Sequence, residues 1–508
     1  MDEAQNKIAR VLRRDDIRGK YPRDLNEDVA RAIGRALPPL FGGQNPLVVV
    51  GWDARLSSPA LAEALSRGLR EAGAQVRSLG LASTEMVYFA AGFAPVDGGV
   101  MVTASHNPAD ENGFKIVRRG AQPVSGEELA AHLGGQSAPP NLFGPGLTVS
   151  SPSSETTNDY AETVIRLSGI RRKNAEKLKV VAEAGNGVGG LAFRQVAARL
   201  PFLDVVYSNE TPDGRFPICL PNPLDPAYMK LAQGRVLADG AALGLAFDGD
   251  ADRVGAVDSK GEVLSASEIM AVLALRALQA PGALPLPPPP PRALQAPGAL
   301  RTKFMYNLVM SQLVPDVIGE MGGAAVMTPI GHGQIKARMR LPQHADCVLA
   351  GEHSGHFFFR DFFRADSGMI AALMLIEAEL QARERGRDLS AEVAEWRERY
   401  AILPEKNFEL PASHPGAAQD VIDAVRRHFA GRGAELKQYA PGDPIPKSIL
   451  RMDFAEEWGK WWLCARPSGN EPLLRLNLEI VAKNNARGRM GQIAAEVIGL
   501  IEENIKHG

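Results

Sequence analysis

Cysteine is scarce in this sequence, and its placement excludes two kinds of stabilised domain. Only three cysteines occur among 508 residues, Cys219, Cys347 and Cys464, and they form no CxxC pair. An odd number of distant thiols fits neither a disulfide framework nor a zinc cluster. We therefore expect a reducing compartment and a cytoplasmic location.

The chain also lacks an excess of either charge and a long apolar run. Lys plus Arg total 57 against 59 Asp plus Glu, so no basic field attracts nucleic acid or an anionic membrane. The N-terminal segment is charged, and the apolar stretch from Met369 to Ile376 ends at Glu377, far short of a membrane span. We expect no nucleic-acid or membrane partner, and nothing in the sequence calls for an obligate protein partner.

The chain is long enough for several domains and has the composition of a globular protein. Hydrophobic residues make up 45% and charged residues 23% of the sequence, which is typical of packed soluble proteins. At about 100 to 200 residues per domain, three to five domains are expected.

Strand-like and helix-like segments alternate over most of the chain. The apolar run 47–50 is followed by a helix from Ser58, as its N-cap, to Gly73, and then by a strand at 76–79. Further short apolar runs lie at 100–103, 179–182 and 243–247. This alternation predicts α/β domains with largely parallel sheets, whose ligands bind at the carboxyl ends of the strands.

The segment after residue 400 has a different pattern. Leu474, Leu476, Leu478 and Ile480 alternate with polar residues, behind a second strand at 461–466. Strict alternation indicates a half-buried antiparallel strand, so a separate α+β domain is expected here.

A direct repeat interrupts the chain. RALQAPGAL occurs at 276–284 and again at 292–300, on either side of the polyproline run 287–291. This pattern indicates a tandem duplication that forms an extended, exposed insertion. We assign it no function and disfavour a role as a ligand of SH3-type domains.

The loop 103–108, Thr-Ala-Ser-His-Asn-Pro, follows a predicted strand and carries a candidate nucleophile. Ser105 stands beside His106 and within loop reach of Lys115. A hydroxyl in this setting could act as a nucleophile or carry a phosphoryl group. The residues alone fit equally well a turn in which Ser105 and Asn107 bond their own backbone.

The loop 248–253, Asp-Gly-Asp-Ala-Asp-Arg, predicts a cation site. In an extended backbone Asp248, Asp250 and Asp252 point to one side, and their mutual repulsion calls for a cation. An EF-hand would need Gly at the position of Arg253 and Glu at that of Ser259. Three carboxylates with open positions suit Mg²⁺ that also holds a phosphate oxygen; a solvated acidic turn is the alternative.

The loops at 351–356 and 466–472 offer groups for binding. Glu352, Ser354 and His356 could bond the hydroxyls of a sugar, whereas the HxxH spacing from His353 would suit zinc. Arg466 precedes a turn whose members Ser468, Gly469 and Asn470 suit a phosphate, although an ordinary β-turn has the same composition.

The run 185–190, Gly-Asn-Gly-Val-Gly-Gly, matches a dinucleotide fingerprint, with Glu210 ending the next strand-like run. A tight strand-to-helix turn needs the same glycines for packing alone.

The four loops together, TASHNP, DGDADR, GEHSGH and RPSGNEP, stand in the order, spacing and strand contexts of the α-D-phosphohexomutases. The chain resembles that family, in its phosphomannomutase/phosphoglucomutase branch, over nearly its whole length apart from the insertion. The resemblance implies the α/β class, with three related mixed α/β domains and a C-terminal α+β domain around a central cleft. The implied domains are 1–150 with the phosphoserine, 151–256 with the metal loop, 257–398 for sugar recognition with the Pro-rich insertion at about 276–300, and 399–508 for phosphate binding.

The same resemblance implies the chemistry. The enzyme would interconvert the 1-phosphates and 6-phosphates of mannose and/or glucose by transferring a phosphoryl group that it carries. A hexose 1,6-bisphosphate would be both the intermediate and an activator. The implied metal site holds Mg²⁺ with Ser105, Asp248, Asp250 and Asp252. The implied catalytic residues are Ser105, Lys115, Arg18 and His106. The implied substrate-binding residues are Arg253, Gly331, His332, Glu352, Ser354, His356, Arg466, Ser468, Gly469 and Asn470, with Lys336 in the same third-domain loop.

Two positions depart from the family pattern. Asp15 stands where the family's YDIRG segment usually has Tyr, and the segment 307–311 lacks a lysine that contacts substrate in many relatives. The terminal His356 of GEHSGH resembles the mannose/glucose branch, but glucosamine mutases differ by one residue in this loop.

Two alternatives from other classes remain open in the sequence. One is an NAD-dependent oxidoreductase that uses the GNGVGG turn, which would leave the three-aspartate loop unexplained. The other is a binding protein for divalent ions or carbohydrates that kept the loops and lost turnover.

Overall fold

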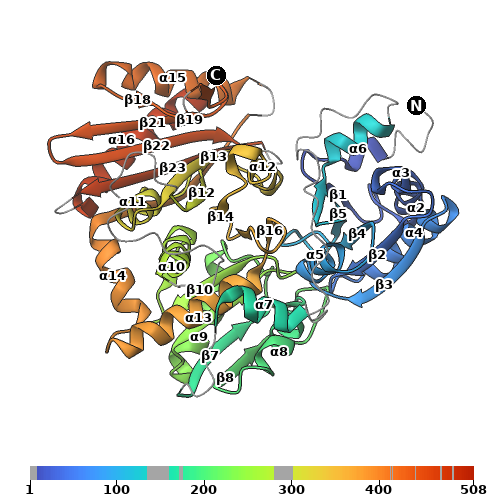
Figure 1. Ribbon diagram of the computed structural model, residues 1–508. Coiled ribbons are helices and arrows are strands. Elements are labelled where there is room, and N and C mark those ends of the chain that lie inside the picture. Colours follow the sequence, from blue (N-terminus) through green and yellow to red (C-terminus); the bar gives the residue numbers. More distant parts are fainter. Residues whose placement is uncertain are drawn as a thin grey trace.

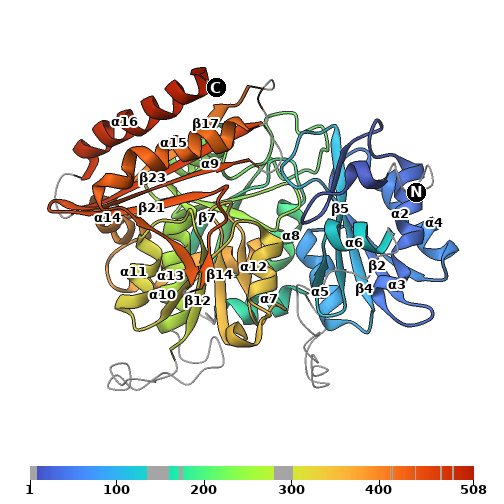
Figure 2. The same ribbon diagram turned by 90° about the horizontal axis from the view of Figure 1, so that it is seen from above.

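The structure is a computed structural model, and it describes residues 8–133, 160–170, 176–279, 301–411, 414, 416–440, 442–468, 472–482 and 486–507. These residues form three α/β units and a fourth unit with an antiparallel sheet, and Figures 1 and 2 show the third and fourth units side by side. The predicted proline-rich duplication lies mostly outside the described residues.

The first sheet has the order β1-β5-β4-β2-β3, with β6 also pairing with β5. Parallel pairs join β2 to β3 and β4, whereas β5 runs antiparallel to β4, β1 and β6. The strands are β1 (Ile17–Lys20), β2 (Leu47–Trp52), β3 (Gln75–Leu81), β4 (Gly98–Val102), β5 (Glu111–Arg118) and β6 (Gln122–Val124), and the helices are α2 (Glu27–Ala36), α3 (Pro38–Phe41), α4 (Ser58–Glu71), α5 (Thr84–Phe93) and α6 (Gly126–Leu133).

The start of α4 differs from the prediction. The cap residue is Ser57, and the hydroxyl of Ser58 donates to Asp53 Oδ1 over 2.6 Å instead of capping the helix. Asp53 follows β2 directly, so this serine is used to hold a carboxylate at the end of the sheet.

The second and third sheets repeat one strand order. They run β11-β10-β9-β7-β8 and β13-β12-β14-β15-β16, and in each the first three strands along the chain are parallel. The strands are β7 (Leu178–Glu183), β8 (Leu203–Ser208), β9 (Leu243–Phe247), β10 (Val254–Asp258), β11 (Val263–Leu264), β12 (Lys303–Asn307), β13 (Ala324–Thr328), β14 (Cys347–Gly351), β15 (Phe357–Phe359) and β16 (Ala365–Asp366). The expectation of largely parallel sheets is therefore wrong for the later strands of each unit.

The physical reason is the length of the connections. The loops 103–110, 248–253 and 352–356 join β4 to β5, β9 to β10 and β14 to β15, and all three pairs are antiparallel. A parallel neighbour would need a crossover of a dozen residues or more. Three loops that the sequence singled out thus occupy the same place in three similar sheets.

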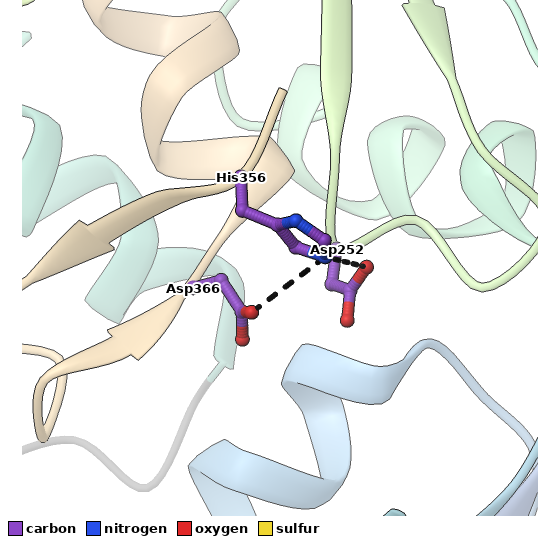
Figure 3. Close-up of side chains that lie close together, drawn as sticks. All are labelled: Asp252, His356 and Asp366. Atoms are coloured by element: carbon purple, nitrogen blue, oxygen red, sulfur yellow. Dashed lines mark ion pairs between the residues drawn. The ribbon is translucent and has the colours of Figure 1, made fainter. Parts of the chain in front are cut away.

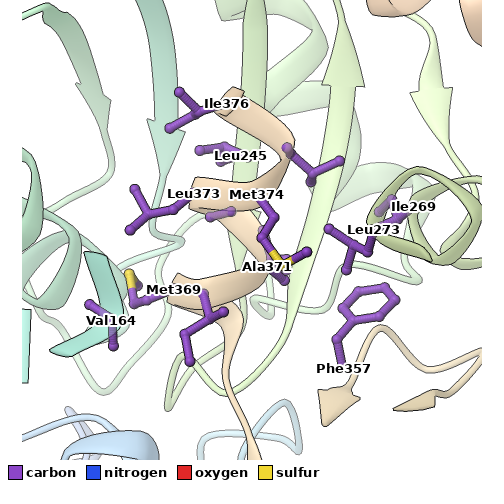
Figure 4. Packing of buried hydrophobic residues seen from close by; sticks show 14 of the residues in the cluster. Val164, Leu245, Ile269, Leu273, Phe357, Met369, Ala371, Leu373, Met374 and Ile376 are labelled. Atoms are coloured by element: carbon purple, nitrogen blue, oxygen red, sulfur yellow. The ribbon is translucent and has the colours of Figure 1, made fainter. Parts of the chain in front are cut away.

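One long helix ties the second and third units into a common core. The helix α13 (Gly368–Glu384) buries 14 of its 17 residues, including all of the apolar stretch 369–376. Figure 4 shows Met369, Leu373 and Ile376 of this helix packed against Val164 and Leu245. The other helices of these units are α7 (Tyr160–Ser168), α8 (Gly189–Ala197), α9 (Pro226–Asp239), α10 (Ala266–Gln279), α11 (Leu313–Glu320), α12 (His332–Arg338), the 3₁₀ turn η2 (Pro342–His344) and α14 (Leu389–Arg399).

The fourth unit is an antiparallel sheet of order β17-β23-β22-β21-β18. Leu474, Leu476, Leu478 and Ile480 of β23 all lie in its core, which confirms the predicted alternation. The elements are β17 (Tyr400–Glu409), α15 (Ala417–Phe429), η3 (Ala430–Arg432), β18 (Glu435–Leu436), β19 (Gln438–Ala440), β20 (Asp443–Pro444), β21 (Leu450–Glu456), β22 (Gly459–Pro467), β23 (Leu473–Ala482) and α16 (Ala486–His507). Across the described ranges, every helix is too short or too polar to cross a membrane.

Candidate active site

Ser105 is buried where the first and second units meet. Its Oγ donates to Asp248 Oδ2 over 2.7 Å and accepts from Arg253 Nη2 over 2.8 Å. Its backbone has φ 52°, a left-handed conformation that a serine rarely adopts and that costs about 1 kcal/mol. The loop therefore holds this hydroxyl in a strained conformation, aimed at the metal loop of the second unit.

Arg55 holds the loop 103–108, the serine loop, in that conformation. Its guanidinium, which is fully buried, donates to the carbonyl oxygens of Ser105 (2.9 Å), Asn107 (2.7 Å) and Glu111 (3.0 Å). Asp53 pairs with Arg55 Nε over 3.1 Å. Sequence reasoning assigned Arg55 no role, although a carboxylate and a guanidinium two residues apart at the end of β2 were a signal for a buried ion pair.

The predicted metal loop brings its three carboxylates together. Asp248, Asp250 and Asp252 are buried after β9 and each offers an oxygen within 4.8 Å of the others. Lys115 Nζ donates to Asp250 Oδ2 over 2.7 Å and also to Asp252. Within the described residues, the Oδ1 atoms of Asp250 and Asp252 have no hydrogen-bond partner. A buried carboxylate oxygen without a donor, such as Asp250 Oδ1, suits a hard divalent cation, so these residues fit Mg²⁺.

The charged groups of this cluster shift one another's pKa values. Burial and the Asp250 carboxylate raise the pKa of Asp248 to about 7. Burial would lower the pKa of Lys115, but Asp250 and Asp252 outweigh burial and raise it. Lys115 of the first unit thus acts as a counter-ion for the acidic loop of the second unit.

Of the remaining predicted catalytic residues, Arg18 bonds the loop that carries Ser105, and His106 lies next to Ser105 within it. Arg18 donates to the carbonyl oxygen of Thr103 and pairs with Asp16 over 2.8 Å. His106 Nδ1 lies 3.2 Å from Ser105 Oγ, and burial and Arg253 lower its pKa well below the ordinary value. The imidazole of His106 is therefore neutral at physiological pH, and its Nδ1 also faces Arg253 Nη2.

His356 links the third unit to the metal loop. Figure 3 shows its ring between Asp252 and Asp366, with Nε2 3.6 Å and 3.9 Å from their carboxylate oxygens. Burial would lower the pKa of His356, but Asp252 and Glu352 raise it to about 9, so the ring is a cation at neutral pH. Among the described residues, no group of potential metal ligands includes His353. The structure thus offers no support for zinc at the HxxH spacing.

Residues of the loop 351–356, the sugar loop, form one hydrogen-bonded set with Gly331 in the third unit. Glu352 accepts from the Gly331 N–H over 2.8 Å and lies 3.3 Å from His356 Nδ1, and Ser354 Oγ lies 2.8 Å from the same nitrogen. Burial would raise the pKa of Glu352, but His356 and the Gly331 N–H bring it down to about 2. The ring of His332 lies 5.9 Å from that of His356.

In the fourth unit, Arg466 and Arg475 are direct cross-strand partners on β22 and β23. Like charges placed opposite one another destabilise a sheet, and Glu405 lies between them, 3.0 Å from Arg466 Nη2 and 3.2 Å from Arg475 Nη1. Arg475 Nη2 also donates to Ser468 Oγ over 3.2 Å. Gly469 and Asn470 lie outside the described residues.

Sequence reasoning missed Glu405 and Arg475. The signal for Arg475 was its polar position in the alternating strand, close to the turn after Arg466. Glu405 gave no signal, because a bulge between Leu403 and Lys406 of β17 sets its direction.

The glycine-rich turn 185–190 packs on the metal loop. A Cβ on Gly187 would lie 2.7 Å from the Gly249 carbonyl oxygen, and the N–H of Val188 donates to that oxygen over 3.1 Å. Glu210 pairs with Arg194. The backbone that would face a pyrophosphate is thus covered by Gly249, and the glycines serve packing.

Each of the two departures packs against another part of the molecule. The side chain of Asp15 packs against Gly333, where a Cβ would lie 2.5 Å from Asp15 Oδ1. Val309 belongs to an apolar cluster with Trp462 and Tyr439 of the fourth unit. A valine at this position is therefore used to join two units.

Comparisons with known proteins give one answer. The phosphoglucomutase/phosphomannomutase α/β/α domain families I, II and III match residues 9–132, 158–261 and 268–400. A protein described as "Phosphohexose mutases" from Xanthomonas campestris pv. campestris is 37% identical over 465 residues, 91% of this chain and 93% of that protein. A phosphomannomutase of Escherichia coli K12 is 36% identical over 473 residues, with the same two coverages. A solved phosphoglucomutase/phosphomannomutase family protein of Burkholderia thailandensis has a TM-score of 0.73 and 28% identity and covers 97% of this chain and 98% of its own.

Proposed function

This chain belongs to the phosphoglucomutase/phosphomannomutase family, and from that premise we propose that it interconverts hexose 1-phosphates and hexose 6-phosphates. The enzyme is an isomerase that transfers phosphoryl groups through phosphoserine at Ser105 and a hexose 1,6-bisphosphate intermediate. The contact of Ser105 Oγ with both Asp248 and Arg253 carries the proposal, because it joins an acceptor hydroxyl, a metal ligand and a cation at one atom.

Each half-reaction exchanges one P–O bond for another. The bond from phosphorus to Ser105 Oγ breaks, a bond to the free sugar hydroxyl forms, and the proton of that hydroxyl is taken up by the enzyme. The second half-reaction returns the other phosphate of the turned bisphosphate to Ser105. Phosphate monoester cleavage is among the slowest uncatalysed reactions, so charge on the transferring group must be met by fixed cations.

The residues around Ser105 have different proposed roles in the transfer. Asp248, Asp250, Asp252 and the phosphate on Ser105 would hold Mg²⁺, which supplies charge neutralisation on the phosphoryl oxygens. Arg253 adds a guanidinium on the same side. Lys115, Arg18 and His106 are proposed to assist the transfer of the proton of the sugar hydroxyl.

Substrate binding would involve the third and fourth units. Gly331, His332, Glu352, Ser354 and His356 are proposed to bind the sugar, and Lys336 supports them through its ion pair with Asp366 at 2.9 Å. Arg466, Ser468, Gly469 and Asn470, joined by Arg475, are proposed to bind the phosphate that does not react. The corresponding domains are 1–150, 151–256, 257–398 and 399–508.

Mannose and glucose phosphates are the proposed substrates, and glucosamine phosphate is the alternative. The names of the phosphomannomutase relatives and His356 at the end of the sugar loop favour mannose and glucose. Hexose 1,6-bisphosphate is proposed as the activator that restores the phosphoserine. A cytoplasmic location without nucleic-acid, membrane or obligate protein partners stays a prediction from composition.

The test is a coupled mutase assay combined with intact mass. We expect turnover of mannose 1-phosphate or glucose 1-phosphate with Mg²⁺ and a trace of hexose 1,6-bisphosphate, and loss of turnover with a chelator. Ser105→Ala should lose at least about 1000-fold in kcat and carry no phosphate, because no hydroxyl remains to be phosphorylated. Ser259→Ala, a serine that donates to Asp388 away from the loops, is the control and should keep both. Full activity in Ser105→Ala, or no turnover of mannose 1-phosphate, glucose 1-phosphate or glucosamine 1-phosphate by the wild type, would refute the proposal.

A further inference from the structure

Thr84, a buried residue in the first turn of α5, makes two hydrogen bonds to the metal loop of another unit. Its Oγ1 donates to Asp250 Oδ2 over 2.5 Å, and its backbone N–H donates to the Asp250 carbonyl oxygen over 3.0 Å. Both residues are fully buried. The backbone and the side chain of Asp250 are thus fixed from one residue, 166 positions away in the chain.

These bonds decide which oxygen of Asp250 is open. Oδ2 accepts from Thr84 and from Lys115, whereas Oδ1 has no hydrogen-bond partner among the described residues. A carboxylate free to rotate would exchange its two oxygens. With Oδ2 held by two donors, Oδ1 is the oxygen left for a cation.

The first turn of α5 is itself held by the second and third units. Glu85, the next residue, accepts from the Tyr160 hydroxyl of α7 over 2.6 Å and from the hydroxyl of Ser367, the cap of α13. Behind that cap, Gly368 packs so closely on the metal loop that a Cβ would lie 2.8 Å from the Ala251 carbonyl oxygen. The starts of α5 and α13 therefore press on the metal loop together and are joined through Glu85.

We propose that Thr84 is a positioning residue that presents Asp250 to the magnesium ion. This inference rests on the proposed function, because it assumes that Asp248, Asp250 and Asp252 hold Mg²⁺. When a residue that hydrogen-bonds a metal ligand is replaced, metal affinity or activity typically falls by about 10- to 100-fold. Among the described residues, Thr84 hydrogen-bonds neither to the proposed sugar loop nor to Ser105, so its effect should fall on Mg²⁺ and not on the sugar.

The test compares Mg²⁺ binding by four forms of the full-length protein. Wild type, Thr84→Val, Thr84→Ser and Thr163→Val are charged with hexose 1,6-bisphosphate, checked for phosphoserine by intact mass, and titrated with MgCl₂ in a calorimeter. Thr84→Val keeps the shape and loses the donor, so its Kd for Mg²⁺ should rise about 10-fold or more. Thr84→Ser keeps the donor and should bind nearly as the wild type does. Thr163→Val, a buried threonine of α7 outside the metal loop, should leave the Kd unchanged.

Kinetics supply a second readout. For Thr84→Val the Mg²⁺ concentration at half-maximal rate should rise with the Kd, while kcat at saturating Mg²⁺ and KM for the sugar phosphate stay near their wild-type values. If Thr84→Val does not fold, Thr84→Ala replaces it in both measurements. An unchanged Kd in Thr84→Val, or an equal weakening in Thr84→Ser, would overturn the inference while leaving the proposed function intact. If the wild type itself binds no Mg²⁺ and turns over no substrate, the proposed function falls and the inference falls with it.

Discussion

Glu85 is a single carboxyl group at which three units of this protein meet. It is fully buried between the hydroxyls of Tyr160 and Ser367, which belong to the second and third units. Burial raises its pKa to about 8, against an ordinary value of 4.5, although both hydroxyls act in the opposite direction. Folding therefore takes up a proton at this residue between pH 4.5 and 8.

The pH dependence of stability should carry the signature of Glu85. Because the unfolded chain has released this proton above pH 4.5 and the folded chain keeps it up to pH 8, stability falls as the pH rises through that interval, by up to about 1.4 kcal/mol per pH unit. Below pH 4.5 and above pH 8 this residue contributes no slope. Glu85→Gln is neutral at every pH, so its stability relative to the wild type should increase from pH 5 to pH 8, as measured by urea denaturation.

The control for that measurement is Glu71→Gln. Two arginines lower the pKa of Glu71 to about 2, so this exposed carboxylate is ionised throughout the same interval and its replacement should shift stability equally at pH 5 and pH 8. A constant difference between Glu85→Gln and the wild type across the interval would show that Glu85 is ionised in the folded protein.

At this scale, the residues that sequence could predict are those whose partners are close in the chain. Asp248, Asp250 and Asp252 follow an apolar strand at intervals of two, so their convergence is a local property of extended backbone. Thr84 and Glu85 gave no signal, because their partners lie 166 and 282 positions away. Arg55 is an intermediate case, since only its pairing with Asp53 is local.

The loops of the site are stacked as layers. The turn 185–190 lies on the metal loop through Gly187, and the metal loop lies on the serine loop through Gly249, whose Cβ would be 2.4 Å from the Ser105 carbonyl oxygen. Each glycine is needed because backbone atoms of the next layer fill the place of a side chain. The layers explain how a fingerprint typical of dinucleotide sites serves a metal loop here.

Gly187→Ala should therefore disturb the metal loop, although Gly187 is not itself a proposed metal ligand. The added methyl would lie 2.7 Å from the oxygen and 2.9 Å from the Cα of Gly249, and these backbone atoms cannot withdraw without moving Asp248 and Asp250. We expect a loss of about 1 to 3 kcal/mol in stability, as overpacking in a core typically costs, together with weaker Mg²⁺ binding. Thermal unfolding and MgCl₂ titration measure the two effects.

Gly234→Ala provides the matched control for that variant. Gly234 lies within α9 with no atom near its Cβ position, so the same substitution there should stabilise the protein by about 0.5 to 1 kcal/mol and leave Mg²⁺ binding unchanged. Gly187→Ala that behaves like Gly234→Ala would contradict the layered packing.

At the scale of helices and strands, an element could be predicted where its own hydrophobic pattern was sufficient to identify it. The apolar runs of β2, β4, β7 and β9 and the alternation of β23 identified strands without knowledge of their neighbours. Strand direction was not predictable, because whether β10 or β15 runs antiparallel depends on which strand it joins. The lengths of the loops 248–253 and 352–356 held that information, since connections so short require antiparallel neighbours.

At the scale of the whole molecule, the fourth unit is bound to the third by a buried polar contact. Glu479 of β23 is fully buried and accepts from the Gln312 N–H over 2.7 Å, from Trp462 Nε1 over 2.5 Å and from the Ser311 hydroxyl. Arg451 adds a bond to the Leu308 carbonyl oxygen over 2.7 Å. The sequence predicted a separate C-terminal domain but could not predict this contact, because it depends on how two folded units meet.

Removal of Glu479 should loosen the fourth unit without unfolding the other three. Glu479→Ala leaves the buried donors of Ser311 and Trp462 and the half-buried Gln312 N–H without an acceptor, at about 1 to 3 kcal/mol for each buried donor, so calorimetry should show a separate transition at lower temperature. If the fourth unit retains the bisphosphate while it turns, the variant should also depend more strongly than the wild type on added hexose 1,6-bisphosphate. Glu496→Gln, which breaks a surface ion pair of the same unit with Arg432, should alter stability by less than about 1 kcal/mol and leave the activator dependence unchanged. A single transition at the wild-type temperature in Glu479→Ala would mean that apolar contacts such as Val309 with Trp462 hold the two units together unaided.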